Sequence, residues 1–185
     1  MKNVSNEKSV KYRKASPDNG FFGEYRFLTL EYEIKIHYCG LEFTNAMALL
    51  QALMSGSTKY YKQFERVSGY KACLIGGLIN HDWVTKKLLC QMLYEVNLAK
   101  FTQFNYLKQY LLNTGDCNLV NVNYVGDTTL GVYNGEGMNL LGKALEVVRR
   151  QLRGDAVDGT PDFPIDQVQP IIYKDSKKIT RYSRK

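Results

Sequence analysis

The sequence has few of the residues that build metal centres and disulfide frameworks. Its 185 residues include only two histidines and four cysteines, which are Cys39, Cys73, Cys90 and Cys117. None of the cysteines forms the closely spaced pair typical of zinc sites and redox motifs. We therefore expect no metal and no cofactor, and we interpret the cysteines as reduced, buried thiols of a cytoplasmic protein.

Long hydrophobic runs are also missing. No apolar run reaches the roughly 18 residues that a membrane-spanning helix needs. The first residues are polar and rich in lysine, unlike a secretory signal. We expect no membrane partner, and the apolar content of 44% predicts one globular domain with extensions.

Positive charge is concentrated at the two ends of the chain. Of the net charge of +7, residues 1–20 contribute five basic and two acidic groups, and 171–185 contribute six and one. Residues 21–153 carry fourteen basic and eleven acidic groups, whereas 154–170 carry four aspartates and no base. Basic ends of this kind usually solubilise a protein, and they would also suit contact with DNA phosphates.

Hydrophobic periodicity predicts an α+β fold that is mostly helical with a small sheet. Alternating residues over 34–38 indicate a half-buried strand that ends in a turn at Gly40. Helical periodicity and capping residues predict helices over 44–54 (with Thr44 or Asn45 as N-cap), 60–67, 69–76, 84–102 (with Asp82 as N-cap), 105–113 and 138–153.

Composition divides the chain into three parts. Residues 1–20 are predicted to be a flexible basic arm ending in a turn, and 21–153 the folded domain. Residues 154–185 hold three of the four prolines and are predicted to form an extended basic arm. This arm would dock on the domain, or on a second protomer of a homo-oligomer, through four apolar residues, which are Phe163, Ile165, Ile171 and Ile172.

The most informative stretch, 113–149, reads as a polar alternating strand, a glycine-rich loop and a helix. Gly131, Gly135 and Gly137 lie in the loop, and Asn139 is placed to cap the helix or to touch a ligand. A glycine loop entering a helix can leave the first N–H groups unpaired, which suits phosphate. A tight structural turn explains the same pattern and is the commoner case, so both interpretations stay open.

This stretch resembles the NADAR family, the fold of a bacterial N-glycosidase that acts on riboflavin-pathway intermediates. The family motifs T-G-D, D-x-x-W-G and G-x-G-x-N-x-L-G correspond to Thr114–Asp116, Asp127–Gly131 and Gly135–Gly142. Gly23–Leu28 match the opening motif of the family, so the resemblance covers about residues 23–153.

The resemblance implies a substrate class and a set of contacts. The implied substrates are ADP-ribose attached to guanine and the N-glycosides of early riboflavin synthesis, with a counter-defence role for phage-encoded members. The implied ligand-binding residues are Arg26, Gln51, Trp83, Lys87, Gly131, Gly137 and Asn139, with Asp127 as the best remaining catalytic acid.

Three departures from the family pattern bear on the chemistry. Met47 and Met54 stand where the family has glutamate and lysine, and Leu130 stands where it has tryptophan. Cleavage of an N-glycosidic bond needs a carboxylate or a nucleophilic lysine, and methionine supplies neither. We expect both methionines to face one pocket with Arg26 and the loop 131–139.

The sequence supports three hypotheses about function. The favoured hypothesis is a NADAR-like protein with a pocket for an ADP-ribose-like or N-glycoside ligand and with lost or altered catalysis. The alternative is an active N-glycosidase that removes ADP-ribose from guanine in DNA or nucleotides, or that hydrolyses riboflavin intermediates. Nucleic-acid binding without chemistry ranks last.

Overall fold

In the part of the chain that the structure describes, the sheet is a single short hairpin. The computed structural model describes residues 16–79, 81–157, 160 and 162–164. Within them β1 (Ile36–Tyr38) pairs antiparallel with β2 (Leu41–Phe43), and Cys39 and Gly40 turn the chain with positive φ angles. The remaining regular elements are helices, which confirms the α+β class with a small sheet.

Six of the seven described helices correspond to predicted ones, and the short helix over Gly23–Leu28 was not predicted. The seven are the 3-10 helices η1 (Gly23–Leu28) and η2 (Thr58–Phe64) and the α-helices α1 (Ala46–Met54), α2 (Gly69–Gly76), α3 (Lys86–Gln103), α4 (Asn105–Leu112) and α5 (Leu140–Arg153) among the described residues. Asn45 caps α1 as predicted. Asp82 does not cap α3: residues 81–84 form a turn first, and the Thr85 side chain accepts the capping hydrogen bond from Leu88 N at 3.2 Å.

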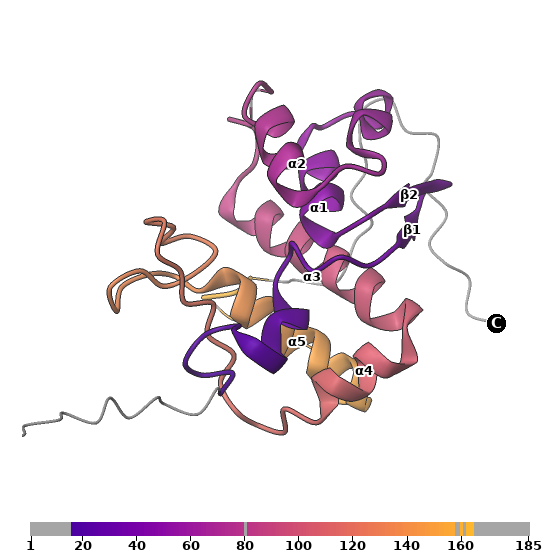
Figure 1. Cartoon of the computed structure of the whole chain (residues 1–185). Coiled ribbons are helices and arrows are strands. Elements are labelled where there is room, and N and C mark those ends of the chain that lie inside the picture. Colours follow the sequence, from indigo (N-terminus) through magenta and orange to yellow (C-terminus); the bar gives the residue numbers. More distant parts are fainter. Residues whose placement is uncertain (1–15, 80, 158–159, 161, 165–185) are drawn as a thin grey trace, which may run out of the picture.

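Helix α3 is the centre of the domain. It packs against α1 and β1 on one side and against α4 and α5 on the other, so α1, α2 and the hairpin are separated from α4 and α5 in Figure 1. Its inward face carries fully buried side chains, among them Met92, Leu93, Val96 and Phe101. The apolar stripe of α5 packs against α3 and completes the core with four buried residues, which are Leu141, Ala144, Leu145 and Val148.

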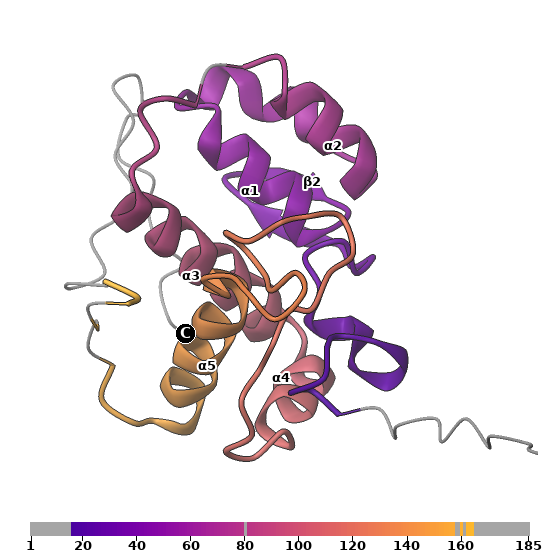
Figure 2. The same cartoon turned by 90° about the vertical axis from the view of Figure 1, so that its left-hand side faces the viewer.

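The segment between α4 and α5 differs from the prediction. The expected alternating strand is absent from its described residues, where only two isolated bridges occur, Val122 with Val132 and Tyr133 with Glu136. The polar side chains that suggested alternation bind nearby backbone groups instead of facing solvent from a sheet. The segment is a long loop at the side of the helices in Figures 1 and 2.

Both ends of the described chain pack on the domain. Ser16–Asn19 form a turn, and Pro17 O accepts a hydrogen bond from Val120 N at 2.9 Å. After α5, Phe163 is buried with 2% of its surface exposed. Ile165, Ile171 and Ile172 lie outside the described residues, as do residues 1–15.

The cysteines are less buried than predicted. Cys90 is buried in α3, but Cys39, Cys73 and Cys117 are exposed. Their positions explain the error, since Cys39 lies in the hairpin turn, Cys73 on α2 and Cys117 in the loop after α4. Over the described ranges, no helix has both the length and the apolar character to cross a membrane.

Candidate ligand-binding site

Helix α1 presents Met47, Gln51 and Met54 on one face, because positions i, i+4 and i+7 align along a helix. The face is held in place at the helix start, where Asn45 Oδ1 accepts a hydrogen bond from Ala48 N at 2.8 Å and Asn45 Nδ2 donates to Val67 O at 3.0 Å. Met47 is buried, whereas Gln51 and Met54 are half-buried. The face therefore offers two thioethers and one amide, and no ionisable group.

The amide of Gln51 lies at the contact between α1 and α2. Gln51 Nε2 is 3.8 Å from Met47 Sδ, and Gln51 Oε1 is buried without a hydrogen-bond partner among the described residues. Oε1 occupies the space that a Cβ would take on Gly76 of α2. Gln51 is thus packed against the neighbouring helix, and its oxygen keeps an unused capacity to accept a hydrogen bond.

Asp127, the predicted catalytic acid, helps to fold its own loop. Its Oδ1 accepts hydrogen bonds from Thr129 N and Leu130 N, both at 2.9 Å. Asn123 completes the turn, because its Oδ1 accepts from Asp127 N at 3.0 Å. One carboxylate oxygen of Asp127 is therefore committed to backbone structure.

Asn139 ties the loop together from the first position before α5. It has a left-handed backbone with φ of 51° and makes no side-chain cap. Its Oδ1 instead accepts from Asn121 N, and its Nδ2 donates to Leu119 O, both at 2.9 Å. Gly131 and Gly137 are needed nearby, because a Cβ on Gly137 would overlap Gly131 O and one on Gly131 would overlap Asn121 O.

The N-terminus of α5 is closed by the same loop. Leu140 N donates to Thr129 O at 3.1 Å, and Leu141 N donates to Leu130 O at 3.0 Å. The expectation of unpaired N–H groups is therefore wrong at these two positions. The loop is a tight structural turn, the commoner of the two interpretations of its sequence.

The remaining predicted contacts come from separate elements. Arg26 lies exposed on η1, and Lys87 lies exposed in the first turn of α3. Trp83 is 39% exposed, and its indole covers Gly56 just after α1, where a Cβ would lie 3.0 Å from the ring. Trp83 is thus close to the end of the Met47–Met54 face.

Two hollows lie away from that face. One, of about 370 Å³, lies between α5 and four residues that follow it, which are Asp155, Thr160, Asp162 and Phe163. The other, of about 420 Å³, lies between η1 and α4. Neither is lined by Met47, Gln51 or Met54. A single pocket formed by α1, the loop 131–139 and Arg26 stays a prediction.

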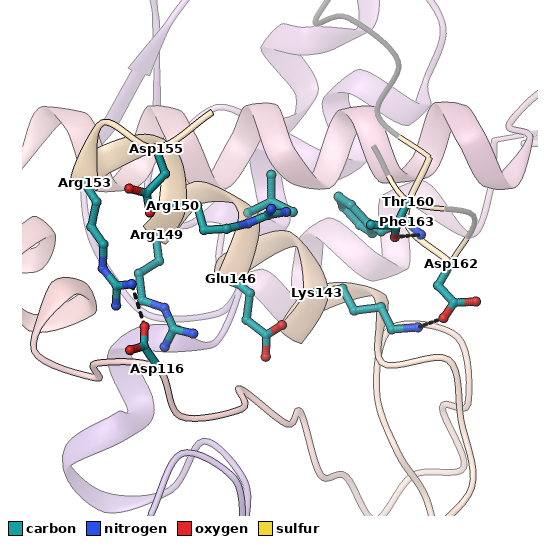
Figure 3. Close-up of a pocket in the computed structure, with 11 residues that line it drawn as sticks. Asp116, Lys143, Glu146, Arg149, Arg150, Arg153, Asp155, Thr160, Asp162 and Phe163 are labelled. Carbon is teal, nitrogen blue, oxygen red and sulfur yellow. Dashed lines mark hydrogen bonds and ion pairs between the residues drawn. The ribbon is translucent and has the colours of Figure 1, made fainter. Parts of the chain in front are cut away.

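The hollow on α5 is lined by charges of both signs (Figure 3). Arg153 Nη1 lies 2.6 Å from Asp116 Oδ1, and Lys143 Nζ lies 3.8 Å from Asp162 Oδ2. The hydrogen bond from Arg153 holds the pKa of Asp116 below its ordinary value. Because its bases are matched by neighbouring acids, this hollow is a poor site for an anion.

Two buried basic side chains, Lys100 and Arg149, hold the loops around the core, a role that the sequence did not reveal. Lys100 is fully buried, and its Nζ donates to Phe27 O at 2.6 Å and Thr29 O at 2.8 Å. Burial lowers the pKa of Lys100 to about 7, against a smaller opposing effect of Glu31. The sequence could have indicated this burial, because Lys100 lies within the apolar stripe of a long helix.

Arg149 is the second buried basic side chain. Its Nη1 donates to Thr114 Oγ1 at 2.7 Å, and its Nη2 donates to Cys117 O at 2.9 Å. The side chain thereby fastens the start of the long loop to α5. Among the described residues, no group of three or more His, Cys, Asp or Glu side chains could hold a metal ion.

Comparisons with known proteins agree with this fold. The chain is similar to the protein YbiA of E. coli, known from an NMR structure, with 26% sequence identity and a TM-score of 0.61 over 71% of this chain and 80% of that one. No curated protein matches the sequence. The family model of the NADAR domain matches residues 11–153. The chain therefore belongs to the NADAR domain family.

Proposed function

We propose that this NADAR protein binds an ADP-ribose-like or other N-glycoside ligand and that its chemistry at the α1 face is lost or altered. The observation that carries the proposal is the face itself, where Met47, Gln51 and Met54 provide no charge. An oxocarbenium-like transition state needs a preorganised negative group or a nucleophile beside it. Two thioethers and an amide supply hydrogen bonding and apolar contact only.

Binding is supported by features that survive the loss of charge. Gln51 keeps a buried, unpaired amide oxygen, and Trp83 offers a partly exposed indole near the end of α1. An amide can accept a hydrogen bond from a ribose hydroxyl or a base, and an indole can stack on a ring. These groups suit recognition of a nucleotide-like ligand without requiring its cleavage.

The remaining acid gives weak support for ordinary catalysis. Asp127 Oδ1 is engaged by two backbone N–H groups, which leaves Oδ2 as its open oxygen. An active N-glycosidase with Asp127 as the acid is therefore the alternative to our proposal. Contacts with DNA through the basic termini, and a homo-oligomer through the C-terminal arm, are further proposals that concern residues outside the described ranges.

The deciding experiment combines binding with turnover. We expect calorimetry to detect ADP-ribose binding to the unaltered chain, and we expect little or no release of ADP-ribose from modified guanine in DNA. Gln51→Ala should weaken binding about tenfold if its amide contacts the ligand, since a lost hydrogen bond in a buried site costs about 1 to 2 kcal/mol.

A variant with both Met47→Glu and Met54→Lys tests the lost chemistry. Cleavage only by this variant would show that the pocket was kept while the charges were lost. Tyr106→Glu is the matched control, because Tyr106 is exposed on α4, outside the predicted pocket. Robust cleavage by the unaltered chain, abolished by Asp127→Asn, would establish the alternative.

A further inference from the structure

The hollow between η1 and α4 is built largely from aromatic rings. It has a volume of about 420 Å³, and its lining residues are Glu24, Tyr25, Phe27, Tyr110, Asn113 and Thr114. None of these belongs to the α1 face or to the loop 119–139. An inference about this hollow therefore goes beyond the proposed function and stands or fails separately from it.

The rings are fixed relative to one another. Phe27 and Tyr110 have centroids 5.6 Å apart and planes at 61°, so they form two walls of a corner. Phe27 is held in place by an edge contact with Phe101, whose ring centroid lies 6.3 Å from that of Phe27. Tyr106 supports Tyr110 in the same manner, with centroids 5.9 Å apart and planes at 80°. Tyr110 remains 52% exposed, which leaves this wall open to solvent.

The side chains that line the hollow include one carboxylate and no basic group, although the chain as a whole carries +7. Glu24 is the acidic side chain of the lining, and no lysine or arginine contributes to it. Burial raises the pKa of Tyr25, and the nearby carboxylates of Glu24 and Asp18 raise it further.

We propose that this hollow binds an organic cation, namely an alkylammonium or guanidinium group. Aromatic faces attract such cations through their quadrupoles, and the attraction increases where water is excluded. Glu24 would supply the countercharge and a charge-assisted hydrogen bond at the rim. A phosphate or carboxylate ligand would meet Glu24 with the wrong sign, and no lysine or arginine lines the hollow to hold it.

The cation has two possible sources with the same chemistry. One is a free small molecule, such as a quaternary amine. The other is the basic arm of this chain, because Lys11, Arg13 and Lys14 lie in the sequence a few residues before the turn Ser16–Asn19, which packs on the domain. The experiment below separates these sources.

The test is an amide NMR titration of the full-length chain with choline and with its uncharged carbon isostere, dimethylbutanol. The two probes share their shape and differ in charge. We expect choline to shift resonances of η1 and α4 and to bind about tenfold more tightly, as expected for a cation between aromatic faces. Equal affinity for both probes, or binding of guanosine with no response to choline, would overturn the proposal.

Variants then assign the effect to the hollow. Tyr110→Leu should weaken choline binding about tenfold and Glu24→Gln a few fold, whereas Tyr110→Phe should keep most of the affinity. Tyr70→Leu and Glu136→Gln are matched controls, because both residues are exposed and lie on other elements. Unchanged affinity in Tyr110→Leu would contradict the site.

Replacing Lys11, Arg13 and Lys14 by glutamine in the full chain identifies the source. Tighter choline binding in this variant supports the cation site and shows that the arm competes for it. Unchanged binding supports the same chemistry with a free cation as ligand. Loss of choline binding would contradict the proposal, because removing positive charge cannot weaken a site that attracts cations.

Discussion

Helix α1 and the segment 113–149 both align with NADAR motifs, but their matching residues do different work. In the segment, the matching residues stabilise the fold. Asn139 cross-links the loop, and Gly137 lets two stretches of backbone approach each other. Arg149 fastens the loop to α5. In α1 the aligned positions that changed, Met47 and Met54, form no such framework. The comparison teaches that the matching residues of the segment maintain the fold, whereas our proposal assigns the chemistry to a few positions of α1.

The largest effect is expected where the loop backbone approaches α5 most closely, at Gly142. Gly142→Ala should destabilise the protein by about 3 kcal/mol or more, because the new Cβ would overlap Leu119 O and the Asn139 side chain. Urea unfolding measures the change. Gly77→Ala is the control, since its Cβ would lie at an ordinary 3.4 Å from Cys73 O. Equal stability of both variants would show that the loop is not tightly held.

The second test removes the cation that fastens the loop. Arg149→Met should cost about 2 to 3 kcal/mol, because Thr114 Oγ1 and Cys117 O lose charged donors in a buried setting. Arg153→Met should cost less than about 1 kcal/mol, because Arg153 and its partner Asp116 are exposed. Thermal unfolding of both variants checks the order, and a larger loss for Arg153→Met would contradict it.

A third test uses pH to examine the other buried basic side chain. The pKa of Lys100 is lowered from 10.5 to about 7 by burial, so between these values the unfolded chain binds a proton that the folded chain does not. Stability relative to Lys100→Met should therefore rise from about pH 7 to about pH 10.5 and be lost as pH falls towards 7. The neutral amine has two N–H groups for the two carbonyls of Phe27 and Thr29.

Urea unfolding at several pH values measures this difference. A stability difference that is flat across the interval would mean that Lys100 stays charged in the folded protein. Lys143→Met is a suitable control, because Lys143 is only partly buried and pairs with the exposed Asp162.

The sequence predicted the helices well because their limits are set locally. Asn45 and Ser68 accept hydrogen bonds from backbone N–H groups three residues later, an interaction that short spacing reveals. The stretch before the glycine-rich loop was wrongly predicted to be a strand, because its hydrogen-bond partners are distant in sequence, as Asn139 is from Leu119. The same reason hid Lys100, which binds Phe27 across the domain. Of the candidate site, the sequence identified the absence of charged side chains on α1, but it did not reveal that Asp127 and Asn139 hold the loop together.

The smallest expected effect concerns α1, where the comparison predicts tolerance. Met54→Lys should change stability by less than about 1 kcal/mol, because Met54 is half-buried and a lysine can extend its ammonium to solvent along an apolar stem. Met92→Lys is the opposite control, since Met92 is fully buried in α3 and a charge there should unfold the protein or nearly so.

Urea unfolding of the two variants decides whether the fold itself imposes methionine at position 54. A near-neutral Met54→Lys would mean that the family's lysine can be accommodated and that its loss reflects function and not packing. A loss above about 2 kcal/mol would instead make Met54 a core residue, and the charge missing from α1 would then be a consequence of how this chain packs.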